Sequence, residues 1–179
     1  MLNLSFYVNV FLLVLNQFTS VSRDSSFSIY VFDIFTGFFS LYGLFYFLVV
    51  KKSFKLPKHS LLFLLFTFYA GITLFVSTPG FSQDEILTGF FYLVRLGFYV
   101  LGALVVFNMV DKKMIKKERV LDAFIFSGVL VAFIGFIQLA LLPDFSILDP
   151  ELGWDPHKNR LASSFFDPNF TGAYLVLCL

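Results

Sequence analysis

The chain has 179 residues, of which 58% are hydrophobic and only 14% are charged, with 28 phenylalanines. Soluble globular domains carry about 25% charged residues, so this composition excludes an ordinary soluble domain and predicts a membrane protein. The formal net charge of +1 gives no sign of a nucleic-acid partner, and we expect none. The single cysteine, Cys178, cannot form a disulfide within the chain and is expected to be a packing or lipid-facing thiol.

Five apolar stretches are long enough for membrane-spanning helices, which need about 20 apolar residues. They cover residues 4–20, 29–50, 61–77, 86–109 and 121–142. Polar turns separate them, including one from Ser20 to Ser28. A sixth stretch begins near Pro168 and runs for about a dozen residues, or about 18 Å of helix. The sequence therefore predicts an all-α, polytopic transmembrane helix bundle with five spans and the start of a sixth. We expect residues 1–179 to form a single transmembrane domain, the N-terminal part of a longer protein.

The basic residues of the loops predict the orientation of the chain. Nine of them lie in the loops after the second and fourth spans: Lys51, Lys52, Lys55, Lys58, Lys112, Lys113, Lys116, Lys117 and Arg119. Only Arg23, Lys158 and Arg160 lie in loops on the other side. Because cytoplasmic loops carry an excess of Lys and Arg, the sequence predicts a cytoplasmic N-terminus and an extracytoplasmic loop at residues 143–166.

Arg95 lies near the middle of the fourth predicted span. An arginine there costs about 2.5–3.5 kcal/mol on insertion scales, so it is expected to face protein or water. It shares one helical stripe with Thr88, Tyr92, Tyr99 and Gly102. A guanidinium among hydroxyls suits a diphosphate ligand, because arginine presents a planar fork of donors. The alternative is a structural arginine bonded to tyrosines, carbonyls or a carboxylate of another helix.

Other polar and small residues of the spans have simpler interpretations. Asp33, near the outer end of the second span, is expected to be an acid at a helix start, at a different depth from Arg95. Gly128, Ala132 and Gly135 form a small-residue stripe, which predicts close helix packing. Near the outer end of the same helix, Gln138 is a weaker polar candidate.

The predicted outer loop is polar. It contains Asp144, Asp149, Glu151, Trp154, Asp155, His157, Lys158 and Arg160. Their spacing matches no zinc or calcium pattern, so no metal is expected. His157 by itself is expected to be a solvated loop histidine. Lys158 and Arg160 are better candidates for binding an anion, because they precede a helix N-terminus.

The stretch R-L-A-S-S-F-F-D-P-N-F-T-G-A-Y-L, from Arg160 to Leu175, joins this loop to the sixth apolar stretch. Asp167 can accept hydrogen bonds from the first N–H groups of a helix, and Pro168 fits the first helical position. The pattern predicts the entry of a loop into a membrane helix.

This stretch resembles the motif of the O-antigen ligase and polymerase family of bacterial membrane proteins. The local match covers residues 128–179 and includes the preceding helix G-V-L-V-A-F-I-G-F-I-Q. Many members have Asn-Pro-Asn where this chain has Asp167-Pro168-Asn169, and that departure keeps the capping chemistry.

The resemblance implies a multi-pass protein of the bacterial inner membrane that acts in lipopolysaccharide and cell-surface polysaccharide assembly. An acceptor hydroxyl of a glycan or lipid would attack the anomeric carbon of a polyprenyl-diphosphate-linked glycan donor, without a cofactor. Arginines would bind the diphosphate, here Arg160 and Arg95 with Lys158, with Tyr92, Tyr99 and Asn169 as possible supports. The catalytic histidine is expected in a later loop, beyond Leu179, so residues 1–179 alone are expected to be inactive. The first alternative function is a transporter or channel component, with Arg95 and Asp33 lining a pathway. A third reading is a structural scaffold subunit.

Overall fold

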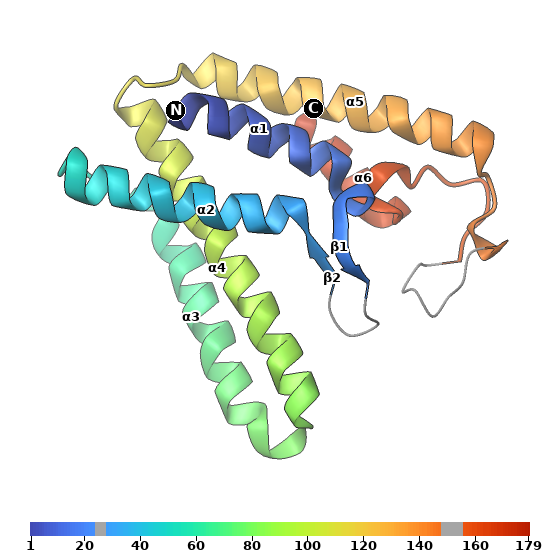
Figure 1. Ribbon diagram of the computed structural model, residues 1–179, viewed down its shortest axis with the longest axis horizontal. Coiled ribbons are helices and arrows are strands. Elements are labelled where there is room, and N and C mark those ends of the chain that lie inside the picture. The colour runs from blue at the N-terminus through green and yellow to red at the C-terminus, as the bar shows by residue number, and fades with distance from the viewer. Residues whose placement is uncertain (24–27, 148–155) are drawn as a thin grey trace. The chain divides into compact units, whose positions relative to one another are not determined.

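The computed structural model describes residues 1–23, 28–147 and 156–179 (Figure 1). Its main helices are α1 (Leu2–Leu15), α2 (Val31–Phe45), α3 (Ser60–Ser77), α4 (Gln83–Asp111), α5 (Lys117–Leu141) and α6 (Pro168–Cys178). With the short helical turns that extend them, α1 to α5 are five helices long and apolar enough to cross a membrane. The prediction of five candidate spans is confirmed, and α6 begins at the predicted proline.

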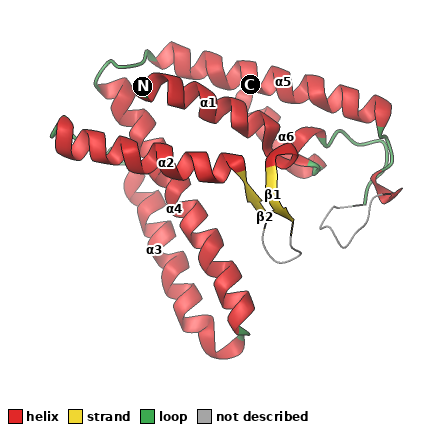
Figure 2. Cartoon of the chain, viewed as in Figure 1, coloured by secondary structure: helices red, strands yellow, loops and turns green. Residues whose placement is uncertain are grey.

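The prediction of an all-α fold is wrong in one place. Strands β1 (Ser20–Arg23) and β2 (Ser28–Tyr30) form a two-stranded antiparallel sheet where a polar turn was expected (Figure 2). β-Branched and aromatic residues favour extended backbone, and Val21, Ile29 and Tyr30 supply them here. The central residues of the expected turn lie outside the described residues.

Local capping explains where α4 begins. The hydroxyl of Ser82 accepts a hydrogen bond from the backbone N–H of Glu85, and the carboxylate of Glu85 accepts one from the backbone N–H of Ser82. This reciprocal pair satisfies two N–H groups that a helix start would leave without partners. The turn Thr78–Gly80, which contains Pro79, separates α4 from α3.

The chain divides into two compact units. The first contains residues 1–3 and 33–115, with most of α2 and all of α3 and α4. The second contains residues 4–32 and 116–179, with most of α1, the β-hairpin, α5 and α6.

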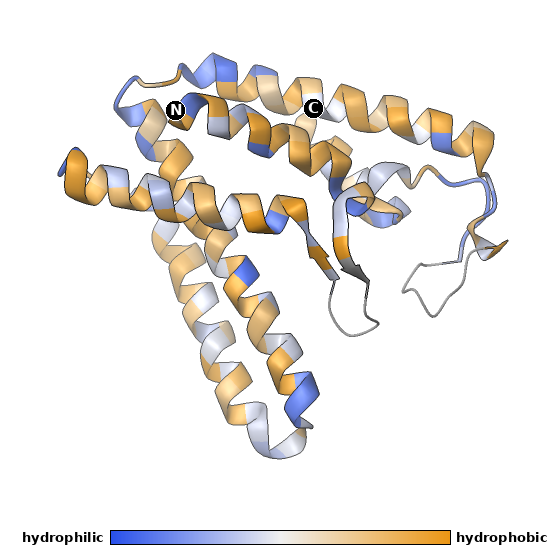
Figure 3. Cartoon of the chain, in the orientation of Figure 1, coloured by the Kyte–Doolittle hydropathy of each residue, from blue (hydrophilic) through white to orange (hydrophobic). Residues whose placement is uncertain are grey.

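In the first unit, α3 and α4 form an antiparallel pair, and their surfaces are largely apolar (Figures 1 and 3). Helix α2 packs against α4 through small residues. A Cβ atom on Gly43 would come within 2.3 Å of a Val105 methyl carbon, and one on Gly102 would come within 3.0 Å of the Ser40 hydroxyl. The Ser40 hydroxyl also donates to the carbonyl of Phe98, at 2.9 Å. Because the contacts advance together along both helices, α2 and α4 run in the same direction.

The core of the second unit lies around α5. Val14, Val131 and Phe165 are its buried apolar centre. The small residues of α5 admit close neighbours, as predicted: a Cβ on Gly128 would come within 2.7 Å of Cys178, and one on Gly135 within 2.4 Å of Leu161. Cys178 is buried at that contact, which confirms its expected role in packing for the described structure.

Candidate functional site

The candidate site is built on residues 160–171, which we call the entry segment because they lead into α6. Asp167 stands just before α6 in extended conformation, and its carboxylate accepts hydrogen bonds from the N–H groups of Asn169 and Phe170, at 2.7 and 3.1 Å. Pro168 is the first helical residue. Both expectations about this helix start are therefore confirmed.

Arg160 reaches the same helix start. Its Nη2 donates to Oδ1 of Asn169 at 3.0 Å, and both residues are exposed. This bond uses one of the five N–H donors of the guanidinium. The structure thus brings Arg160 to Asn169, another predicted site residue, which lies in the first turn of an apolar helix.

The side chain of Gln138, in α5, binds the backbone of the entry segment. Its Oε1 accepts hydrogen bonds from the backbone N–H groups of Ala162 and Ser163, at 2.9 and 3.2 Å. The hydroxyl of Ser163 donates to the carbonyl of Val131, and the hydroxyl of Thr171 donates to the carbonyl of Ala162, both at 2.6 Å. The bonds to Gln138 and Val131 fix the buried backbone of the segment to α5, and the Thr171 bond joins its beginning to the first turn of α6.

The same bonds stabilise an uncommon backbone conformation. Ser163 and Phe166 have φ angles of 52° and 54°, in the left-handed region that residues other than glycine rarely adopt. Such conformations persist only where surrounding contacts determine them, and they concentrate at functional sites. The entry segment therefore has a specified shape rather than that of a solvated linker.

The expectation that His157 is a solvated loop histidine is wrong. Its side chain is only 6% exposed and stacks on the ring of Phe145, with the ring centroids 4.4 Å apart. The backbone N–H of Phe145 also donates to the carbonyl of His157, at 2.8 Å. Burial against an aromatic ring was not visible in the sequence, because the two residues come from distant parts of the loop.

Lys158 lies beside this stack and pairs with a carboxylate. Its Nζ is 2.8 Å from Oδ2 of Asp144, and its side chain is 68% exposed. The hydrogen bond from Lys158, with further bonds from the side chain and backbone of Ser146, lowers the pKa of Asp144 from its ordinary 3.8 to about 2. Lys158 thus has a carboxylate partner in the loop, and its predicted contact with diphosphate stays a prediction.

Arg95 forms an ion pair between two helices of the first unit. Its Nη2 lies 2.7 Å from Oδ2 of Asp33, and the two side chains are only 15% and 12% exposed. The hydroxyl of Tyr99 donates to the other carboxylate oxygen, and the ring of Tyr92 lies 5.3 Å from the guanidinium carbon. Tyr92, Arg95 and Tyr99 of the predicted stripe therefore lie together, and Arg95 meets a carboxylate of another helix, which is the structural alternative foreseen for it.

The expected difference in depth between Asp33 and Arg95 is wrong. Asp33 lies in the first turn of α2, whereas Arg95 lies about 18 Å along α4 from Gln83, at 1.5 Å per residue. Helix α4 is displaced along its axis, so its first turns extend beyond the start of α2. The sequence-based expectation assumed that both helices begin at one surface.

The predicted residues fall in both units. Arg95, Tyr92 and Tyr99 belong to the first unit, and Lys158, Arg160 and Asn169 to the second. The predicted loop acids Asp149, Glu151 and Asp155, with Trp154, lie outside the described residues. Within the described ranges, no group of three or more His, Cys, Asp or Glu side chains could hold a metal ion.

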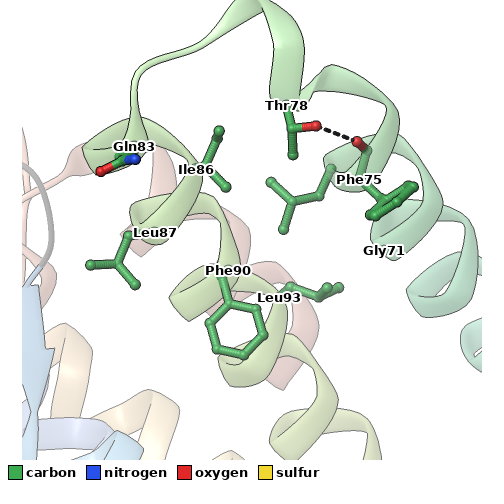
Figure 4. A pocket seen from close by; sticks show the side chains of 9 residues that line it. Gly71, Phe75, Thr78, Gln83, Ile86, Leu87, Phe90 and Leu93 are labelled. Carbon is green, nitrogen blue, oxygen red and sulfur yellow. Dashed lines mark hydrogen bonds between the residues drawn. The ribbon is translucent and has the colours of Figure 1, made fainter.

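The grooves beside the α3–α4 pair are apolar. The groove near the turn between α3 and α4 has a volume of about 530 Å³. It is lined by Leu74, Phe75, Leu87, Phe90 and further side chains of both helices (Figure 4). Near it, the hydroxyl of Thr78 donates to the carbonyl of Phe75, at 2.9 Å, and closes the last turn of α3. Such a lining suits lipid chains or another apolar helix rather than a charged ligand.

Two polar contacts escaped the sequence-based prediction. The hydroxyls of Ser127 and Tyr174 are hydrogen-bonded across α5 and α6, at 2.6 Å. Asn108 is completely buried near the end of α4. Ser127, Tyr174 and Asn108 are polar residues within apolar helices, and this rare position is the signal in the sequence that could have identified them.

No protein-family model, curated protein or solved structure matches this chain. The resemblance carried by residues 160–175 therefore stays a prediction from the sequence.

Proposed function

We propose that the chain contributes the donor-binding part of a membrane glycosyltransferase of the O-antigen ligase and polymerase type. It would lie in the bacterial inner membrane with a cytoplasmic N-terminus. The entry segment would then face the extracytoplasmic side, where a polyprenyl-diphosphate-linked glycan would present its diphosphate. The acceptor would be a glycan or a lipid, and no cofactor is required.

The observation that supports this proposal is the bond between Arg160 and Asn169 at the start of α6. It holds an exposed guanidinium beside the N-terminus of an apolar helix, on a segment that Gln138 fixes in place. When an acceptor hydroxyl attacks the anomeric carbon, negative charge gathers on the leaving diphosphate. A positioned cation stabilises that charge, and an arginine matches its geometry with two parallel N–H donors.

The Arg95–Asp33 ion pair bears on the alternative, a transporter or channel component. That alternative relied on these two residues as pathway-lining charges. Since each neutralises the other and Tyr99 bonds the same carboxylate, helix packing accounts for both. We therefore favour glycan transfer and assign the diphosphate contact to Arg160 before Arg95.

The test is an Arg160→Ala substitution in the protein as its gene encodes it, with glycan transfer measured in isolated membranes. We expect transfer to fall by about 10²-fold or more, the usual effect of removing one donor that stabilises transition-state charge. Arg160→Lys should recover only part of the activity, because lysine lacks the planar fork.

Arg119→Ala is the matched control, because Arg119 is an exposed arginine in the first turn of α5, far along the chain from the entry segment. It should leave transfer within about twofold of the unsubstituted protein. Full transfer activity in Arg160→Ala, with normal amounts of protein in the membrane, would refute the proposal.

A further inference from the structure

Asn108, near the end of α4, binds the loop that follows α2, which is far from it in the sequence. Its Oδ1 accepts a hydrogen bond from the backbone N–H of Lys55 at 2.8 Å, and its Nδ2 donates to the carbonyl of Lys55 at 3.0 Å. The same Nδ2 donates to the carbonyl of Leu104 at 2.8 Å. The side chain is fully buried, so the loop after α2 is held against the last turns of α4 by a satisfied polar contact.

A second contact strengthens this junction. Nζ of Lys55 lies 2.9 Å from Oδ1 of Asp111, and Nζ of Lys112 lies 3.2 Å from the other oxygen of that carboxylate. Both the backbone and the side chain of Lys55 are therefore tied to the end of α4.

Six lysines belong to the two segments that meet at this junction, the loop after α2 and the residues that follow α4. We call them the basic platform: Lys51, Lys52, Lys55, Lys58, Lys112 and Lys113. All of them are exposed except Lys112, which is half-buried. Asp111 is the single carboxylate among them. One carboxylate cannot neutralise six ammonium groups, so the basic platform keeps a strong positive charge. Figure 3 shows the end of α4 as hydrophilic, in contrast to the largely apolar helix before it.

Exposed apolar side chains adjoin the lysines. Val49, Val50 and Leu56 are 53%, 58% and 60% exposed. Val49 and Val50 end a helix that is apolar enough to cross a membrane, and Leu56 lies in the loop that follows it, so the lysines of this loop stand at the boundary between apolar and polar surface. Lysines at such a boundary lie at the depth of lipid phosphate groups, and clusters of four to eight basic residues there attract anionic lipids.

We propose that the basic platform is a preformed binding surface for the headgroups of anionic phospholipids in the surrounding bilayer. The Asn108–Lys55 contact fixes the loop after α2 against the end of α4 before a lipid arrives, so less conformational entropy is lost on binding. The lysines of both loops then contact the phosphates of the same group of lipids. This inference is independent of the glycan-transfer proposal.

The experiment measures binding of short-chain phosphatidylglycerol to the detergent-solubilised full chain by isothermal titration calorimetry, with short-chain phosphatidylcholine as the neutral probe. We expect saturable binding of phosphatidylglycerol and at least tenfold weaker binding of phosphatidylcholine. Equal binding of the two lipids would overturn the proposal. Displacement of phosphatidylglycerol by equimolar inorganic phosphate would also overturn it, because the surface would then be a free phosphate site.

Two substitutions separate geometry from charge. Asn108→Leu removes the contact without changing any charge, and it should weaken phosphatidylglycerol binding about tenfold. The double substitution Lys55→Gln with Lys113→Gln removes one charge from each loop. It keeps the Asn108 contact, because that contact uses the backbone of Lys55. This double substitution should weaken phosphatidylglycerol binding by a similar factor.

Lys116→Gln with Lys117→Gln is the matched control, since it removes the same charge from the start of α5, which belongs to the second unit. It should change binding less than twofold. Equal losses in the two lysine pairs would reduce the effect to net charge and overturn the proposal. Gel filtration shows whether Asn108→Leu folds. If it does not fold, the comparison of the two lysine pairs decides whether the basic platform binds the lipid. If it folds and binds phosphatidylglycerol normally, the proposal of a preformed surface is refuted.

Discussion

Arg95 and Asp33 are 62 positions apart in the sequence, yet their charged atoms lie 2.7 Å apart within a pair of apolar helices. Taking two charges out of water is costly, and their attraction repays that cost only with good geometry and further hydrogen bonds. Tyr99 supplies such a bond to the carboxylate. The ion pair therefore fixes the position of α4 along α2, because a shift of one helical turn would separate the two charges and leave each one buried without its partner.

This relationship predicts strong coupling between the two residues. Arg95→Met or Asp33→Leu alone should destabilise the detergent-solubilised chain by about 3–5 kcal/mol, because each leaves an uncompensated buried charge. The double substitution should recover most of that loss, since neither charge is then present. Thermal unfolding of all four proteins gives the coupling energy as a double-mutant cycle. Simple additivity of the two single effects would contradict the ion pair.

Gln138 is expected to determine the shape of the entry segment. Gln138→Leu removes the acceptor of two buried N–H groups, those of Ala162 and Ser163, and should cost about 1–3 kcal/mol for each group left unsatisfied. Hydrogen exchange at these two amides should accelerate relative to amides in the middle of α5.

Gln138→Glu is the conservative control for that prediction. It keeps an oxygen acceptor at the same place, so both amides should stay protected. Unchanged exchange in Gln138→Leu would show that other contacts hold the segment.

The start of α6 is expected to tolerate asparagine in place of Asp167. The side chain of Asp167 caps two N–H groups, and loss of such a cap costs about 1 kcal/mol. Asp167→Ala should lower the free energy of unfolding by that amount, whereas Asp167→Asn should leave it nearly unchanged because the amide oxygen can accept the same bonds. Thermal unfolding compares the two, and an equal loss in both would mean that the negative charge matters more than the cap.

The Asp144–Lys158 contact makes the loop after α5 sensitive to acid. The pKa of Asp144 is about 2 in the folded chain, below its ordinary 3.8. Because the folded-state pKa is the lower one, the contact contributes its full stability above about pH 4 and loses it as the pH falls through 2. A carboxyl-carbon NMR titration of Asp144 measures this pKa directly.

Lys158→Met is the informative substitution for the same group. It removes the main cause of the shift, the hydrogen bond from Lys158, so the pKa of Asp144 should rise toward 3.8. Ser146 should keep it somewhat below that value through its own hydrogen bonds. A pKa that does not move would show that Ser146 alone stabilises the carboxylate.

Much of the local structure could be predicted because it depends on neighbouring residues. Apolar runs of about 20 residues predicted the spans, and the pairing of Asp167 with Pro168 predicted the start of α6. The β-hairpin was missed because its strands are three and four residues long, too short for a clear alternating pattern. The burial of His157 was missed because a lone histidine carries no sign of the aromatic ring that will cover it.

The sequence by itself determined the five long helices, the start of α6 and the closeness of packing at the glycines of α5, since these follow from hydropathy, capping and side-chain size within a few residues. Only the tertiary structure decided that Arg95 meets Asp33, that Gln138 holds Ala162 and Ser163, and that Asn108 joins the loop at Lys55. The physical reason is that these contacts depend on how far one helix is displaced along another. A shift of a single turn, about 5.4 Å, changes every such partner while leaving the pattern of apolar residues intact.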